Sequence, residues 1–261
     1  MRDAHLHLAD ERLYLRAEEI MATLRTAGVT RLVVNGTSPG DWGRVADLAR
    51  RFPEVLPSFG LHPWKVNEVA EGWREELEDR LGTFPEAGVG EIGLDRWIEG
   101  YDLPRQKEVF SEQLAIAGWV SGPISIHVLR AWGALEECLD DWSNPRPFLL
   151  HSYGGSRELV PKLLERGAWF SLSGYFFRPD KAAKLEVFRA VPEDRLLLET
   201  DAPDMLPPEG MRLARFQDEE VNHPANLAAV YTAFANWRGM EMTEATLLID
   251  ENFEQWAGGK K

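Results

Sequence analysis

Short apolar runs alternate with longer stretches in which apolar residues recur at helical spacing. The short runs, which predict buried strands, are Arg2–His7, Arg31–Gly36, Val55–Gly60, Gly88–Gly93, Pro123–His127, Phe148–His151, Ala168–Leu172 and Arg195–Thr200. Helical spacing covers 15–27, 40–51, 66–82, 104–119, 130–141, 155–165, 180–189, 222–237 and 243–257. Eight strands, each followed by a helix, favour an α/β fold of the closed (β/α)8 TIM-barrel type. An open, doubly wound sheet is the alternative, because both folds alternate strands and helices.

The chain reads as one unit. No linker, internal repeat or low-complexity stretch divides it, and 261 residues suit one barrel, so we expect a single hydrolase domain over 1–261. Pro39 and Pro104 are placed to begin helices. Trp119 is expected to pack in the core, and His223, together with Asn222, to cap the barrel helix that the Asn222-His-Pro224 block leads into.

Composition narrows the classes of protein. At 44% hydrophobic and 28% charged residues, the chain resembles an ordinary soluble domain. Its first residues are already strand-like and no apolar run reaches the roughly 18–20 residues of a membrane helix, so we expect a cytoplasmic protein without a membrane partner. A single cysteine excludes an intramolecular disulfide or a thiolate metal site, and Cys138 is expected to be apolar filler in a helix.

The net charge of −14 argues against a protein that tracks duplex nucleic acid nonspecifically. Such proteins carry a basic stripe, and none is visible here. Most of the acidic residues lie in helical segments, where solvated faces are the expected role.

Polar side chains that bind metals stand at the ends of several predicted strands. They include five of the six histidines, and the candidates are His5, His7, Glu91, His127, His151 and Asp201, with His62 after a further strand. Burying such groups is costly unless they coordinate an ion or act in catalysis. Mixed nitrogen and oxygen ligands suit a divalent ion, which lowers the pKa of a bound water from 15.7 to roughly 7–9. Asp201 is the natural base to take the proton from that metal-activated water.

Blocks along nearly the whole chain resemble the TatD family of metal-dependent deoxyribonucleases, within the amidohydrolase-like barrels. They include Asp3-Ala-His5-Leu-His7-Leu, Gly60-Leu-His62-Pro63, Gly90-Glu91-Ile-Gly-Leu-Asp95, His151-Ser-Tyr-Gly-Gly-Ser156 and Leu197-Leu-Glu199-Thr-Asp201-Ala-Pro203. The resemblance implies a barrel that cleaves phosphodiesters, typically from the ends of DNA. It also implies two bound divalent ions, of Zn, Mn or Mg. Their ligands would be His5, His7, Glu91, His127, His151 and Asp201. His62 would lie near the scissile phosphate.

The chain departs from the family pattern at positions that would contact the substrate. Family members usually have a second histidine where this chain has Trp64, and an arginine at Leu129, whereas here the arginine is Arg130. We therefore expect His62, Trp64 and Arg130 to bind substrate, and Asp201, Glu91 and His62 to serve catalysis.

Three functions are compatible with this sequence. The leading hypothesis is a metal-dependent exonuclease on single-stranded DNA ends. The second is an amidohydrolase or esterase for a small amide, lactone or phosphoester, which would explain the acidic charge. The third is a catalytically idle barrel that serves as a binding subunit. Oligomeric state does not follow from residue types.

Overall fold

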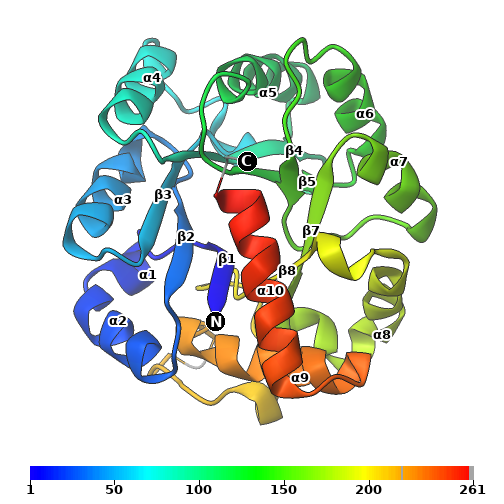
Figure 1. The fold of residues 1–261 in the computed structure, drawn as a ribbon. Coiled ribbons are helices and arrows are strands. Elements are labelled where there is room, and N and C mark those ends of the chain that lie inside the picture. The colour runs from blue at the N-terminus through cyan, green and yellow to red at the C-terminus, as the bar shows by residue number, and fades with distance from the viewer. Residues whose placement is uncertain (219, 259–261) are drawn as a thin grey trace.

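Eight parallel strands form one sheet that closes on itself (Figure 1). The computed structural model describes residues 1–218 and 220–258, so positions 219 and 259–261 of the expected domain lie outside the described residues. The strands are β1 Arg2–Leu6, β2 Arg31–Asn35, β3 Val55–Phe59, β4 Gly88–Asp95, β5 Ile124–Leu129, β6 Phe148–Leu150, β7 Ala168–Ser173 and β8 Leu196–Glu199. At the seam, the Asp201 amide donates to His5 O (3.0 Å) and the His7 amide to Ala202 O (2.7 Å). The predicted TIM barrel is confirmed, and the open sheet is wrong.

Helices surround the strands and follow the predicted spacing in most places. They are α1 Glu11–Tyr14, α2 Ala17–Thr26, α3 Pro39–Arg51, α4 Trp73–Thr83, α5 Leu103–Ala117, α6 Trp132–Asp140, α7 Val160–Glu165, α8 Ala182–Leu185, α9 Leu227–Arg238 and α10 Met242–Ala257. Pro39 and Pro104 lie in the first turns of α3 and α5, as expected.

Four predicted helices begin late or are shorter in the structure. One of them, predicted over 222–237, becomes α-helical only at Leu227, after the 3-10 turn Pro224–Asn226. The segment predicted as helix 66–82 becomes helical only at Trp73, because Gly72 precedes it with a left-handed φ of 90° that an α-helix cannot continue. In the 155–165 segment the 3-10 turn Arg157–Leu159 comes first, and the α-helical part begins at Val160, with Pro161 in its first turn. The 180–189 segment consists of 3-10 turns around the four-residue α8.

The amino end of the barrel is sealed by apolar packing. Phe253 and Trp256 of α10 pack against a buried layer of strand residues: Ala4, Val33, Leu56, Leu149, Trp169 and Leu197. Figure 1 shows α10 lying across the centre of the barrel. Burying each such aromatic side chain contributes roughly 1.5–3 kcal/mol. Because α10 closes this end, a substrate can approach the barrel interior only from the carboxyl ends of the strands.

Cys138 and Trp119 differ in whether they are buried. Cys138 is buried in α6, as expected. Trp119 is 84% exposed, so the expectation that it packs in the core is wrong. The reason is that α5 ends at Ala117, which leaves Trp119 in the turn beyond the helix. Within the described residues, no helix is both long and apolar enough to span a bilayer.

Candidate metal centre

Two imidazoles from the end of β1 face each other inside the barrel mouth. His5 Nε2 and His7 Nε2 are 3.2 Å apart. His7 Nδ1 donates to the carbonyl oxygen of Asn35 at the end of β2 (3.1 Å), which turns Nε2 of His7 toward His5 Nε2. His5 Nδ1 lies 2.7 Å from Ser125 Oγ on β5. Groups on β2 and β5 therefore orient the two rings.

Glu91 lies at the middle of the cluster and is buried. Its Oε2 lies 3.1 Å from His7 Nε2 and 3.6 Å from His5 Nε2. Its Oε1 faces three further nitrogens: His151 Nε2 at 2.8 Å, His127 Nδ1 at 3.0 Å and His62 Nε2 at 3.3 Å. The two oxygens of one carboxylate thus face two separate groups of imidazoles.

Asp201 enters from the segment that follows β8. Its Oδ1 lies 3.6 Å from Nε2 of both His5 and His7. Asp201 has a positive φ of 51°, a left-handed conformation that Asp and Asn tolerate better than most residues. His5, His7 and Asp201 form one group that could hold an ion, and His62, Glu91 and His127 form another.

His127 is held from behind by Asp95, the last residue of β4. His127 Nε2 donates to Asp95 Oδ2 at 2.8 Å, which presents Nδ1 toward Glu91. Asp95 Oδ2 also accepts from Trp64 Nε1 at 2.8 Å, and Oδ1 accepts from the amide of Trp97 at 2.6 Å. Burial would raise the pKa of Asp95, but these bonds, that of His127 first, lower it to about 2. Burial would lower the pKa of His127, but Asp95 and Glu91 raise it to about 9.

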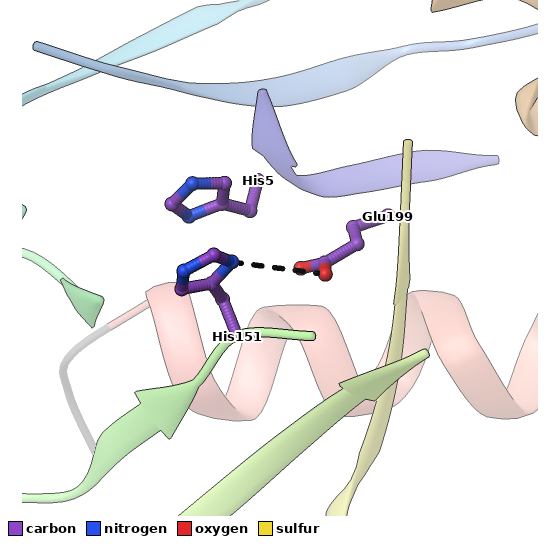
Figure 2. A group of neighbouring side chains, drawn as sticks. All are labelled: His5, His151 and Glu199. Atoms are coloured by element: carbon purple, nitrogen blue, oxygen red, sulfur yellow. Dashed lines mark ion pairs between the residues drawn. The ribbon is translucent and has the colours of Figure 1, made fainter. Parts of the chain in front are cut away.

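A third group comes from β1, β6 and β8. Figure 2 shows the His5 and His151 rings lying one over the other, with centroids 4.0 Å apart, and Glu199 directed at His151. Glu199 Oε1 accepts from the Ser152 amide at 2.8 Å and lies 3.9 Å from His151 Nδ1. Ser171 on β7 donates to the other oxygen. His151 Nδ1 is buried and has no hydrogen-bond partner among the described residues.

The buried imidazoles and carboxylates of this cluster shift one another's pKa values. Burial raises the pKa of Asp201 to about 7. Burial would also raise the pKa of Glu91, but the surrounding histidines, His62 first, hold it well below its usual range. Burial lowers the pKa of His5, whereas in His7 the bond to Glu91 outweighs burial and raises it to about 10. Protons on imidazoles thus balance the carboxylates, and a divalent ion would supply the same positive charge.

The structure brings all seven expected catalytic and ligand residues to one place: His5, His7, His62, Glu91, His127, His151 and Asp201. Trp64 lies at the mouth, 43% exposed, with its ring 5.0 Å from that of His62. Arg130 follows β5 directly and is exposed. Asn35 and Ser125 were not predicted to belong to the site, although polar residues inside apolar strand runs were a usable signal.

Asp3 and His223 have structural contacts. Asp3 accepts hydrogen bonds from Thr200 Oγ1 (2.6 Å) and from the Thr200 amide (3.1 Å), which ties β1 to the end of β8. Its bond to His5 involves the backbone amide of that residue at 3.2 Å. His223 Nδ1 accepts from the Ala225 amide at 3.0 Å and caps the 3-10 turn Pro224–Asn226 that leads into α9. The expected capping role of His223 is confirmed.

A closed parallel barrel with imidazoles and carboxylates at the carboxyl ends of its strands defines the class of metal-dependent hydrolases with an amidohydrolase-like barrel. The family model "TatD related DNase" matches residues 2–258. The chain belongs to this family. The predicted membership of the TatD family and the predicted class of metal-dependent nuclease are thereby confirmed.

Individual relatives span the whole chain. The 3'-5' ssDNA/RNA exonuclease TatD of Dickeya dadantii is 30% identical over 97% of this chain and 96% of its own length. The protein of the same name from Citrobacter rodentium is 29% identical over 99% and 98%. Among solved structures, the TatD homologue YjjV from Escherichia coli K12 has a TM-score of 0.89 at 26% identity, covering 99% of this chain and 98% of its own.

Proposed function

We propose that this chain is an exonuclease that removes nucleotides from ends of single-stranded DNA or RNA, using two divalent ions. One observation carries the proposal: the two oxygens of Glu91 face two separate groups of imidazole nitrogens. A carboxylate placed in this way can bridge two ions, the arrangement used to stabilise both the attacking and the leaving oxygen of a phosphodiester.

The donor set fits such ions. His5, His7 and Asp201 would hold the first, together with Glu91 Oε2. The second would be held by His127, His151 and Glu91 Oε1. Four imidazoles with two carboxylates favour Zn²⁺ or Mn²⁺ by ligand type, with Mg²⁺ as the third candidate.

The ions would lower the pKa of a water molecule and offset the charge that develops on the phosphate. Asp201 would accept the proton of the attacking water on Oδ2. This oxygen makes no hydrogen bond within the described residues and lies 4.0 Å from His151 Nδ1. His62 Nδ1 accepts from the Trp64 amide at 3.2 Å, so its hydrogen is on Nε2. In this structure that N–H faces Glu91 Oε1 at 3.3 Å; with Glu91 bound to the ions, it would be available to donate to an oxygen of the scissile phosphate.

At the mouth, Trp64 and Arg130 contact the end of the strand. A base on an aromatic face contributes about 1–3 kcal/mol, enough to replace one lost phosphate contact. The relatives are named 3'-5' ssDNA/RNA exonucleases, which supports a single-stranded substrate and attack from the 3' end. No observation favours the small-molecule hydrolase or the idle barrel, and the complete donor set argues against the latter.

The test is an assay on end-labelled single-stranded DNA and RNA with Zn²⁺, Mn²⁺ and Mg²⁺ supplied singly, and with a chelator control. We expect stepwise shortening of the oligonucleotide with at least one metal. Full activity after exhaustive chelation and dialysis would contradict metal dependence, and internal cuts without stepwise products would contradict an exonuclease.

We also propose a cytoplasmic location. The single Cys138 is buried and free, as suits a reducing compartment. Cell fractionation with an antibody against the chain tests this.

A further inference from the structure

Unpaired cations gather at the mouth of the barrel. Nearly all described lysines and arginines form an ion pair with a carboxylate, and the exceptions are Arg50, Arg96, Arg130, Arg146, Arg157 and Lys184. Four of these exceptions follow the carboxyl ends of four successive strands, β4 to β7: Arg96, Arg130, Arg157 and Lys184. The other two lie at the opposite end, near the end of α3 and just before β6.

Two of these cations come from neighbouring backbone positions. Asp95 pairs with Leu129 in the register of β4 and β5, and the next residues are Arg96 and Arg130. The Arg96 amide donates to Leu129 O at 2.9 Å. Further round the mouth, Lys184 Nζ donates to Gly154 O at 2.7 Å, which joins the segments that follow β6 and β7.

Exposed aromatic side chains have the same distribution. Four large aromatic residues are exposed in the described chain: Trp64 at 43%, Trp97 at 57%, Tyr101 at 40% and Trp119 at 84%. The first three lie in the segments that follow β3 and β4, and only Trp119 lies at the opposite end. Arg96 lies over the Tyr101 ring, with its guanidinium carbon 5.6 Å from the ring centroid.

The aromatic residues are anchored to the metal centre through Asp95. Its Oδ2 holds the Trp64 indole and His127, both at 2.8 Å, while Oδ1 holds the Trp97 amide at 2.6 Å. One carboxylate thus sets the position of both tryptophan residues relative to a proposed ligand of the ions.

We propose that the arc from β3 to β7 is a binding track for the single-stranded polynucleotide beyond its scissile end. This inference rests on the proposed function. Trp64 and Trp97 stack unpaired bases, and Arg96, Arg130 and Lys184 contact the phosphates that follow. The track explains how a chain of net charge −14 binds a polyanion: the cations that acidic residues leave unpaired are concentrated where the strand leaves the centre.

The test compares a single-stranded 12-mer of dT with bis(p-nitrophenyl) phosphate, which has no bases to stack and no further phosphates. The variants are Trp97→Ala and Arg96→Gln, and the matched controls from the opposite end are Trp119→Ala and Arg50→Gln. We expect the ratio of kcat/KM on the 12-mer to that on the small diester to fall about 5–100-fold in Trp97→Ala. Both controls should keep the wild-type ratio.

Binding gives a second readout that does not depend on turnover. Anisotropy of the fluorescein-labelled 12-mer, with chelator present, should show weaker binding by Trp97→Ala than by Trp119→Ala. In Arg96→Gln, the slope of log affinity against log salt should be smaller in magnitude by about 0.7. Unchanged ratios, or equal losses in variants and controls, would overturn the track. If the wild type hydrolysed neither substrate, this would count against the proposed function. The anisotropy measurement would still show whether the track binds the 12-mer.

Discussion

His127 donates through Nε2 to Asp95 at 2.8 Å, and this single bond decides which nitrogen of the ring faces Glu91. A carboxylate behind a ligand histidine fixes the tautomer and the ring orientation. Because Asp95 Oδ2 also accepts from the indole of Trp64, the ring at the mouth and the ring at the centre share one anchor.

Asp95→Asn should therefore weaken metal binding. An amide that keeps its oxygen at the place of Oδ2 turns its NH₂ group against the Trp97 amide, and the opposite orientation turns NH₂ against His127 and Trp64. In both orientations a hydrogen bond of Asp95 and the negative charge behind His127 are lost, so the ring loses its fixed orientation. We expect the affinity for Mn²⁺, measured by calorimetry on metal-free protein, to fall about 10–100-fold. Asp79→Asn on the exposed face of α4 is the matched control and should bind as wild type does. Equal affinities for the two variants would contradict an orienting role.

Trp64→Ala should impair the use of substrate more than it impairs folding. The side chain is 43% exposed, so its removal costs little packing. We expect KM for single-stranded DNA to rise about 5–100-fold with little change in melting temperature. Trp64→Phe keeps a stacking face but loses the N–H, and should lie between Ala and wild type. A large drop in melting temperature with unchanged KM would assign Trp64 to the core instead.

Asp201→Asn should abolish turnover and leave the fold intact. Asn tolerates the left-handed φ of 51° at this position, but lacks the charge that would hold an ion and take the proton of water. We expect a loss of at least about 10²–10⁴-fold in kcat, with an unchanged circular-dichroism spectrum. A variant that retains a tenth of the wild-type rate would move the base elsewhere, with Glu91 the next candidate. An unfolded variant would make the residue structural.

His223 should make the stability of the fold depend on pH. Burial, then the charge of Arg16, lowers the pKa of its imidazole from its ordinary 6.5 to about 4. The unfolded chain therefore binds a proton more readily than the folded chain, and stability due to neutral His223 is lost as pH falls from about 6.5 to about 4.

The check uses His223→Asn, which keeps a capping oxygen for the Ala225 amide. Urea unfolding of both proteins, measured with chelator across that pH range, should show wild type losing more free energy of unfolding than the variant does. Parallel pH profiles would mean that other groups carry the acid sensitivity.

Local pattern was enough to predict the strands and the centre. All eight strands were legible because buried parallel strands are short continuous apolar runs, and none depended on knowing its partner. The candidate ligands could be recognised because His5, Glu91 and Asp201 interrupt or end such runs, where polar groups need a reason to be buried. Closure of the barrel then brings strand ends from across the chain to one mouth.

What the sequence alone determined was therefore the order of elements and the chemistry of the ligand set. Tertiary structure decided which groups act on one another: Asp95 on His127 and Trp64, Ser125 on His5, and Asn35 on His7. It also decided that helix α4 begins only after Gly72, and that Trp119 is exposed while Trp97 lies beside the mouth. The physical reason is that these relationships depend on strand register and on where each chain segment turns. Both are set by contacts between residues that lie far apart in the sequence.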